Sequence, residues 1–156
     1  MENMNFDDIL SLSPEEMIHR ARTKGWASSA IGWVVYAALR IFGQKPQTFE
    51  GICPYFVIGK GRSGLELGWF FVCGKNASHA THVHEVGHLI QNAKVGGLKV
   101  LGLSICSVVR FWTRRISKSK TAYDSWWFEG QATTLGAQYL ERIKATQGKE
   151  DHQWRT

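Results

Sequence analysis

The residues with the clearest chemical potential form the run His84-Glu85-Val86-Gly87-His88. Two histidines four positions apart lie on one face of a helix, so both imidazoles can reach the same metal ion. Glu85 projects from the neighbouring side of that helix, where its carboxylate can hold and deprotonate a water molecule without binding the metal. This arrangement predicts metal-assisted hydrolysis with Glu85 as the general base.

A catalytic metal site of this kind needs a third protein ligand and keeps its fourth position for water. A third histidine six residues after His88 is excluded, because Lys94 occupies that position. Glu129 is the preferred candidate, since it is a lone acid in an apolar stretch near a predicted helix start and small residues follow it. Asp124 is the alternative, either as a ligand or as an acceptor that orients a histidine.

Three further residues near the predicted ligands in the sequence have side chains that could belong to the site. Tyr123 could donate its phenolic hydroxyl to the oxyanion of a tetrahedral intermediate, and packing of its ring on the core is the alternative. His82 stands two residues before His84, which places it on the opposite side of a helix. His79 lies further upstream, so neither of these histidines is expected to bind the metal.

Four helices are predicted around these residues. The first, residues 14–24, begins with Ser13 as its cap and Pro14 in its first turn. The second, residues 26–42, is expected to be largely buried, and the third, residues 79–93, carries the histidines. The fourth, residues 125–145, carries Glu129, and the apolar residues 98–112 favour a further buried helix because they are too few to span a membrane.

Two strands are predicted between the second and third helices. Residues 55–58 and 67–73 are rich in aromatic and β-branched side chains, and the glycine-rich residues 59–64 separate them. Residues 67–73 are the candidate edge strand, which could bind an extended peptide through main-chain hydrogen bonds.

The length of 156 residues fits a single domain. Within it we expect N-terminal helices over residues 1–50, a catalytic core over residues 51–145 and a flexible tail over residues 146–156. Cys53, Cys73 and Cys106 form no CxxC pair, which favours free thiols in a reducing compartment.

The formal net charge is +6, but the basic residues are dispersed, so nucleic acid is not the expected partner. The N-terminus shows no signal peptide, which predicts a cytoplasmic protein. The composition leaves open a peripheral membrane contact, and the sequence gives no indication of the oligomeric state.

The chain resembles small bacterial zincin-like metallopeptidases of the gluzincin type. The resemblance spans about residues 59–140 and rests on two motifs, His84-Glu85-Val86-Gly87-His88-Leu89-Ile90-Gln91 and Glu129-Gly130-Gln131-Ala132. It implies a minimal zincin-like α+β fold, mainly helical, with a small β-sheet before the histidine helix. It also implies Zn²⁺ held by His84, His88 and Glu129, a peptide or protein substrate, and Glu85 as general base and proton shuttle.

Two functions follow from these observations. The first is a zinc-dependent hydrolase, namely a metallopeptidase that cleaves peptide bonds. The alternative is a catalytically inactive zincin-like binding or regulatory module with a structural or vestigial metal site. Some domains similar to this one resemble parts of toxins or mobile elements, which leaves open export within a larger toxin-like system.

Overall fold

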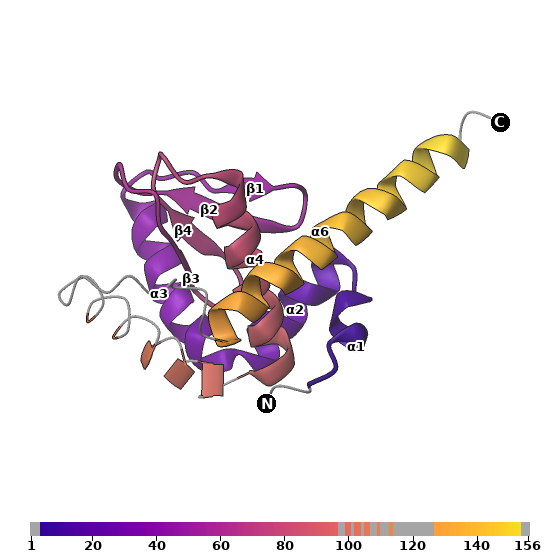
Figure 1. Cartoon of the computed structure of the whole chain (residues 1–156). Coiled ribbons are helices and arrows are strands. Elements are labelled where there is room, and N and C mark those ends of the chain that lie inside the picture. The colour runs from indigo at the N-terminus through magenta and orange to yellow at the C-terminus, as the bar shows by residue number, and fades with distance from the viewer. Residues whose placement is uncertain are drawn as a thin grey trace.

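The computed structural model describes residues 4–96, 99–100, 102–103, 105–106, 109, 113 and 127–153, with residues 148–153 as backbone only. The helices are α1 (Asp7–Leu10), α2 (Pro14–Lys24), α3 (Trp26–Ile41), α4 (His79–Val95) and α6 (Trp127–Gln153). The strands are β1 (Gln47–Phe49), β2 (Cys53–Val57), β3 (Gly64–Glu66) and β4 (Phe71–Cys73). The fold is α+β and mostly helical, as predicted, with one small four-stranded sheet (Figure 1).

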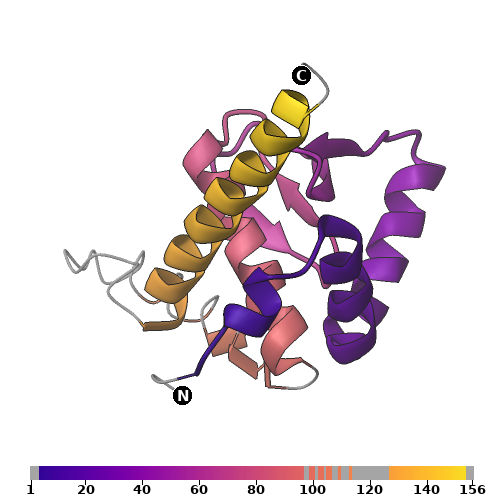
Figure 2. The same cartoon turned by 90° about the vertical axis from the view of Figure 1, so that its right-hand side faces the viewer.

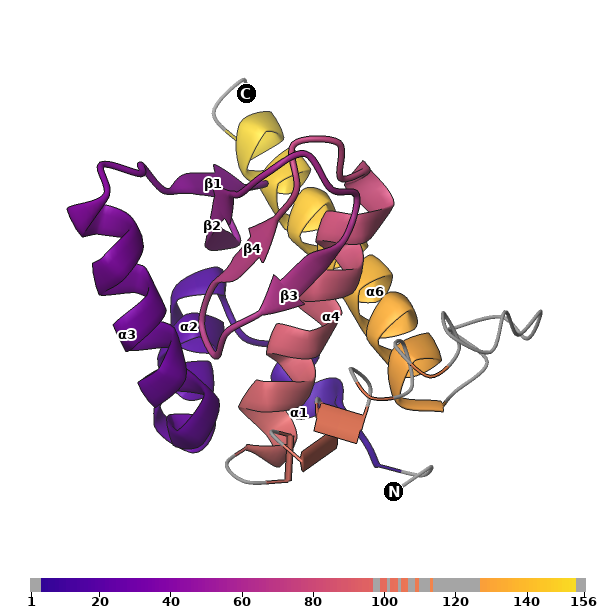
Figure 3. The ribbon, with the colours of Figure 1, turned by 90° about the vertical axis from the view of Figure 1, so that its left-hand side faces the viewer.

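The sheet is mixed, and its strands lie in the order β1-β2-β4-β3. The central strands β2 and β4 are parallel, whereas β1 pairs with β2 and β3 pairs with β4 in antiparallel fashion. Successive side chains of a strand point to opposite faces. On β2 and the segment leading into β4, Phe56 and Phe70 therefore face α3, while Phe71 and Cys73 face α4 and the main core. Helices thus cover both faces of the sheet (Figure 3).

The prediction that residues 67–73 form the edge strand is wrong. Only Phe71–Cys73 is a strand, and it lies between β2 and β3. The chain turns at Gly68, whose φ of +90° lies in a region that favours glycine. A Cβ at this position would also come within 2.6 Å of the Ser29 backbone on α3. The edge strand next to the histidine helix is β3, which begins at Gly64, a residue assigned from sequence to the glycine-rich loop.

The predicted start of α2 is confirmed. The Ser13 hydroxyl accepts a hydrogen bond from the Glu16 amide, and the Glu16 carboxylate accepts one from the Ser13 amide, which completes a capping box. Met17 and Ala21 then bury their side chains against the core that contains α4. This packing fixes the helix beside the middle of α4, the element that carries the histidines (Figure 2).

The two helices that carry the candidate ligands, α4 and α6, pack against each other at very close range. A Cβ added to Gly87 would lie 1.8 Å from the backbone oxygen of Ala132, and one added to Gly136 would lie 1.9 Å from the backbone oxygen of Val83. Small residues at these positions therefore allow the two backbones to touch. α6 itself is longer than predicted, because the polar residues after 145 continue the helix to Gln153 and carry it beyond the body of the fold (Figure 1).

The prediction that the second helix is largely buried is wrong. The inner face of α3 is buried through Ala27, Ser28, Ser29 and Gly32, but its outer face is exposed along the whole helix. The other apolar stretch, residues 98–112, lies mostly outside the described residues. Among the described residues, no helix combines the length and apolar character needed to cross a membrane.

The close contact of α4 with α6 generates a stability prediction. Gly136→Ala is expected to lower the free energy of unfolding by about 2–3 kcal/mol, because the new methyl group overlaps the Val83 carbonyl. The usual effect has the opposite sign, since alanine favours a helix over glycine by about 1 kcal/mol. Urea unfolding followed by circular dichroism measures the change. Gln138→Ala, at an exposed position two residues on, is the control and should change the stability by less than about 0.5 kcal/mol.

Candidate metal centre

The helix α4 places the two motif histidines side by side. Ser78 caps the helix by accepting a hydrogen bond from the Thr81 amide, so regular helical geometry begins before the motif. The Nε2 atoms of His84 and His88 lie 3.1 Å apart, and their side chains are 21% and 14% exposed. Both imidazoles therefore converge on one point at the surface of the core, as their spacing predicts.

Glu129 joins the histidines from the first turn of α6. Its Oε2 lies 3.0 Å from the Nε2 of His84 and 3.3 Å from the Nε2 of His88, and its side chain is 1% exposed. Three potential ligand atoms from two helices thus lie within 4.8 Å of one another. The predicted grouping of His84, His88 and Glu129 is confirmed.

A glutamine sets the tautomer of His88. Gln91 Nε2 donates to the Phe128 carbonyl oxygen at 2.9 Å and to Gln131 Oε1 at 3.0 Å, which turns its own Oε1 towards His88. The His88 Nδ1 then donates to that oxygen at 2.9 Å. Because Nδ1 holds the proton of the neutral ring, Nε2 presents its lone pair to the centre.

A threonine does the same for His84. The Thr133 hydroxyl donates to the backbone oxygen of Glu129 at 3.3 Å, so its oxygen accepts a hydrogen bond from His84 Nδ1 at 2.9 Å. The Nε2 of His84 is thereby left with a lone pair as well. A metal-binding histidine is usually oriented in this way by a partner on its other nitrogen.

The chemistry of this donor set fits a divalent cation. Two imidazole lone pairs and one carboxylate oxygen meet at separations of 3.0–3.3 Å, and without a positive charge between them they would repel. Zinc at its ordinary bond lengths spaces tetrahedral ligand atoms about 3.3 Å apart. The distances, the ligand types and the orienting hydrogen bonds therefore agree with a site for one metal ion.

Glu85 lies next to this centre and is 4% exposed. Burial raises the pKa of its carboxyl group well above the usual range, and the neighbouring carboxylates of Glu66 and Glu129 raise that pKa further. A hydrogen bond from the backbone of Glu66 acts in the opposite direction. Glu85 thus lies close enough to Glu129 for the charge of Glu129 to raise the pKa of Glu85.

The edge strand β3 runs along Glu85. A Cβ on Gly64 would lie 2.6 Å from the Cγ and Oε1 atoms of Glu85, so glycine is required at that position. The amide of Gly74 donates to the Ser63 oxygen, and the amide of Leu67 donates to the Phe70 oxygen. Since backbone groups alternate along a strand, the backbone groups of residues 63, 65 and 67 face β4 and those of residues 64 and 66 face away from it.

Among the described residues, two further histidines named in the sequence analysis do not join this centre. Tyr123 and Asp124 lie outside the described residues. His79 contacts Glu50 at 3.3 Å, and His82 packs on Phe49 at the other end of the sheet. The predicted free thiols are confirmed for the three cysteines, of which Cys53 and Cys73 are buried and Cys106 is exposed.

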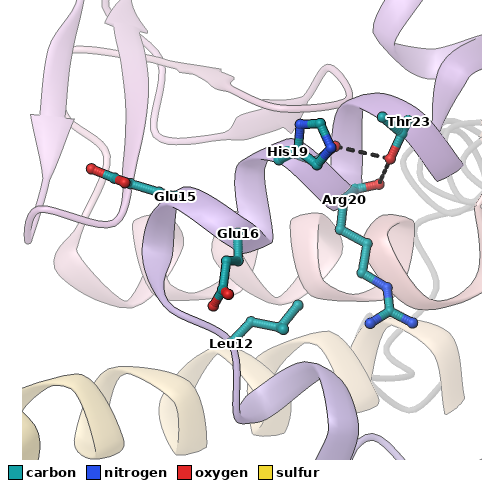
Figure 4. A pocket seen from close by; sticks show the side chains of 6 residues that line it. All are labelled: Leu12, Glu15, Glu16, His19, Arg20 and Thr23. Carbon is teal, nitrogen blue, oxygen red and sulfur yellow. Dashed lines mark hydrogen bonds between the residues drawn. The ribbon is translucent and has the colours of Figure 1, made fainter.

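An open hollow of about 420 Å³ lies along α2, and its lining includes neither His84 nor His88. Figure 4 shows its lining, in which the Thr23 hydroxyl donates to backbone oxygens of its own helix rather than into the hollow. The lining residues are Leu12, Glu15, Glu16, His19, Arg20 and Thr23. None of them belongs to the donor set formed by α4 and α6.

Comparison of the chain with protein-family models, with curated proteins and with solved structures gave no match in any of the three.

The sequence did not single out the orienting residue Thr133, and it introduced Gln91 and Gln131 through the resemblance alone. A signal for Thr133 was nevertheless present. Thr133 stands four residues after Glu129, on the same face of α6, so any element that brings Glu129 to the histidines brings Thr133 as well.

Two adjacent threonines test the orienting role. Thr133→Val is expected to weaken metal binding by about tenfold, because His84 loses the acceptor that fixes its tautomer. Thr134→Val is the matched control, since its exposed hydroxyl donates to the Gly130 oxygen and does not contact the centre. Competition with a fluorescent zinc chelator measures both affinities. Equal affinities in the two variants would contradict the role of Thr133.

Proposed function

We propose that the chain is a zinc-dependent hydrolase, and specifically a metallopeptidase. The observation that carries the proposal is the convergence of His84, His88 and Glu129, with Glu85 beside them on the same helix as the histidines. Two histidines and a carboxylate are a ligand set that catalytic zinc uses, with the remaining position left for water or substrate.

Zinc held by these three residues would supply a Lewis acid that polarises a carbonyl group and makes water more acidic. Imidazole and carboxylate ligands also suit other divalent ions, so the choice of zinc rests on the resemblance and on the small ligand separations. The residues of the chain supply the remaining requirements, namely orientation of the imidazoles, exclusion of bulk water from Glu129 and a site for the proton.

Glu85 is the residue suited to carry that proton. Its carboxylate accepts a proton from the attacking water and then donates it to the nitrogen of the departing amine, so that it ends the reaction in its starting state. Burial and the nearby carboxylates raise the pKa of Glu85, which makes its ionised form a stronger base in the first transfer. The positive charge of a cation bound to Glu129 would lower that pKa, which would keep Glu85 ionised before the first transfer and make its protonated form a better acid in the second.

The edge strand β3 provides a surface for the substrate. The backbone groups of Gly64 and the carbonyl group of Glu66 point away from β4, so an extended peptide that paired with them would run beside Glu85 and the donor set. Addition of a strand to a sheet edge is a common way to bind a peptide without strict dependence on its sequence. This geometry favours a peptide over a small polar substrate.

Metal content tests the ligand set. Protein purified without an affinity tag or chelator is expected to hold about one zinc per chain by plasma mass spectrometry. His88→Ala and Glu129→Ala should each abolish this stoichiometric zinc, because two remaining ligands bind the ion weakly. Full retention of zinc by Glu129→Ala would contradict the assignment of Glu129, and absence of zinc binding by the wild-type protein would favour the inactive binding module.

Glu85→Gln separates binding from catalysis. The variant is expected to retain zinc and to lose about 10²–10⁴-fold in turnover of a peptide library, since the amide cannot accept the proton. Glu141→Gln makes the same chemical change at an exposed position of α6 and should leave turnover unaltered. Wild-type levels of turnover in Glu85→Gln would contradict the role of Glu85.

A further inference from the structure

The helix α3 has its polar and apolar residues arranged the wrong way round for a surface helix of a water-exposed protein. Its inner, buried positions include Ser28, Ser29 and Gly32. Asn92 on α4 accepts a hydrogen bond from the Ser28 hydroxyl at 3.0 Å, and a Cβ on Gly32 would lie 2.1 Å from the Leu67 backbone oxygen. Small residues are therefore needed on the inside, so that α3 can lie close to α4 and the sheet.

The outer face of α3 is apolar from one end to the other. It is formed by residues at the spacing of one helical face, and each of them is exposed: Trp26, Ala30, Trp33, Val34, Ala37 and Ile41. Val34 is 72% exposed and Ile41 is 81% exposed, as is Phe42, which follows the helix. A contiguous apolar stripe on the surface of a protein marks an interaction site, so this stripe indicates a partner.

The charges around this helix indicate what that partner is. Between Glu16 and Glu50 the chain contains no acidic residue, but it contains five basic ones, Arg20, Arg22, Lys24, Arg40 and Lys45. Arg20 pairs with Asp8, whereas within the described part of the chain the other four make no salt bridge. An apolar stripe flanked by unneutralised cations matches a surface that is apolar within and negatively charged outside.

Arg22 and the tryptophans show how the border of the stripe is built. The guanidinium of Arg22 lies 4.1 Å from the ring centroid of Trp69 and 5.5 Å from that of Trp33. The Trp33 ring is 51% exposed. Tryptophan and arginine placed together at the edge of an apolar face are suited to the boundary between lipid head groups and acyl chains.

We propose that α3 is a docking helix for an anionic lipid membrane. It lies parallel to the bilayer surface with its outer stripe in the interfacial region, and the basic residues at its two ends contact lipid phosphates. Each cation near such a surface strengthens binding appreciably, and the exposed tryptophan and aliphatic side chains contribute by leaving water. The proposal is independent of the metal and of the hydrolytic function.

This placement leaves the metal centre free. Figure 3 shows α3 and α6 on opposite sides of the sheet and α4. A membrane in contact with the outer face of α3 would therefore lie on the side away from α6, and a substrate could still reach His84 and His88.

Vesicle binding tests the proposal. The full chain is mixed with vesicles of equal parts phosphatidylglycerol and phosphatidylcholine and sedimented, and pure phosphatidylcholine vesicles serve for comparison. The double variant Val34→Asp, Ile41→Asp is expected to bind the anionic vesicles at least about tenfold more weakly than the wild-type chain. The control Thr134→Asp, Gln138→Asp makes the same charge change on exposed positions of α6 and should stay within about twofold of the wild type. Circular dichroism checks that all three proteins are folded.

Three results would overturn the proposal. The wild-type chain could fail to sediment with anionic vesicles, both double variants could lose binding equally, or neither could lose it. Analytical ultracentrifugation distinguishes the alternative occupant. A concentration-dependent dimer that Val34→Asp, Ile41→Asp abolishes, in a chain that does not bind vesicles, would assign the stripe to a second copy of the protein.

Discussion

The close approach of α4 and α6 is the constraint on which the site depends. His84 and His88 come from one helix and Glu129 from the other, so the separations of 3.0–3.3 Å between their ligand atoms exist only while the two backbones touch. Gly87 and Gly136 make that contact sterically allowed. The contact that packs α4 against α6 therefore also assembles the donor set. A shift of either helix by one residue would disrupt both the packing and the ligand geometry.

The contact also concentrates negative charge where water is scarce. Glu129 and Glu85 are both almost fully buried, and the charge of Glu129 contributes to the raised pKa of Glu85. A buried carboxylate without a counter-charge is strongly unfavourable, so a bound cation would stabilise the folded chain as well as complete the site. The hydrogen bonds of Gln91 and Thr133 serve the same end, because they occupy the Nδ1 atom of each imidazole and leave Nε2 to face the centre.

The sequence predicted the parts of this arrangement that local chemistry determines. The capping box defines α2, and the spacing of the histidines defines their face of α4. The sequence could not locate β3, because a three-residue strand shows too little alternation of polar and apolar residues. Gly64 makes room for Glu85, and this contact joins residues that are far apart in the chain. The exposure of α3 was missed for a related reason. An apolar helix indicates burial, and only the folded chain reveals that the small residues Ser28, Ser29 and Gly32 are on its inner side.

One buried side chain links the two surfaces. Asn92 accepts from Ser28 on α3, and its amide donates to the Gly68 oxygen in the turn between β3 and β4 at 2.8 Å. The same amide lies 3.4 Å from the carboxylate of Glu66, the last residue of β3. A polar group with all its partners satisfied inside a core fixes those partners in one arrangement. The outer stripe of α3 and the edge strand beside Glu85 are consequently held at a fixed relative orientation.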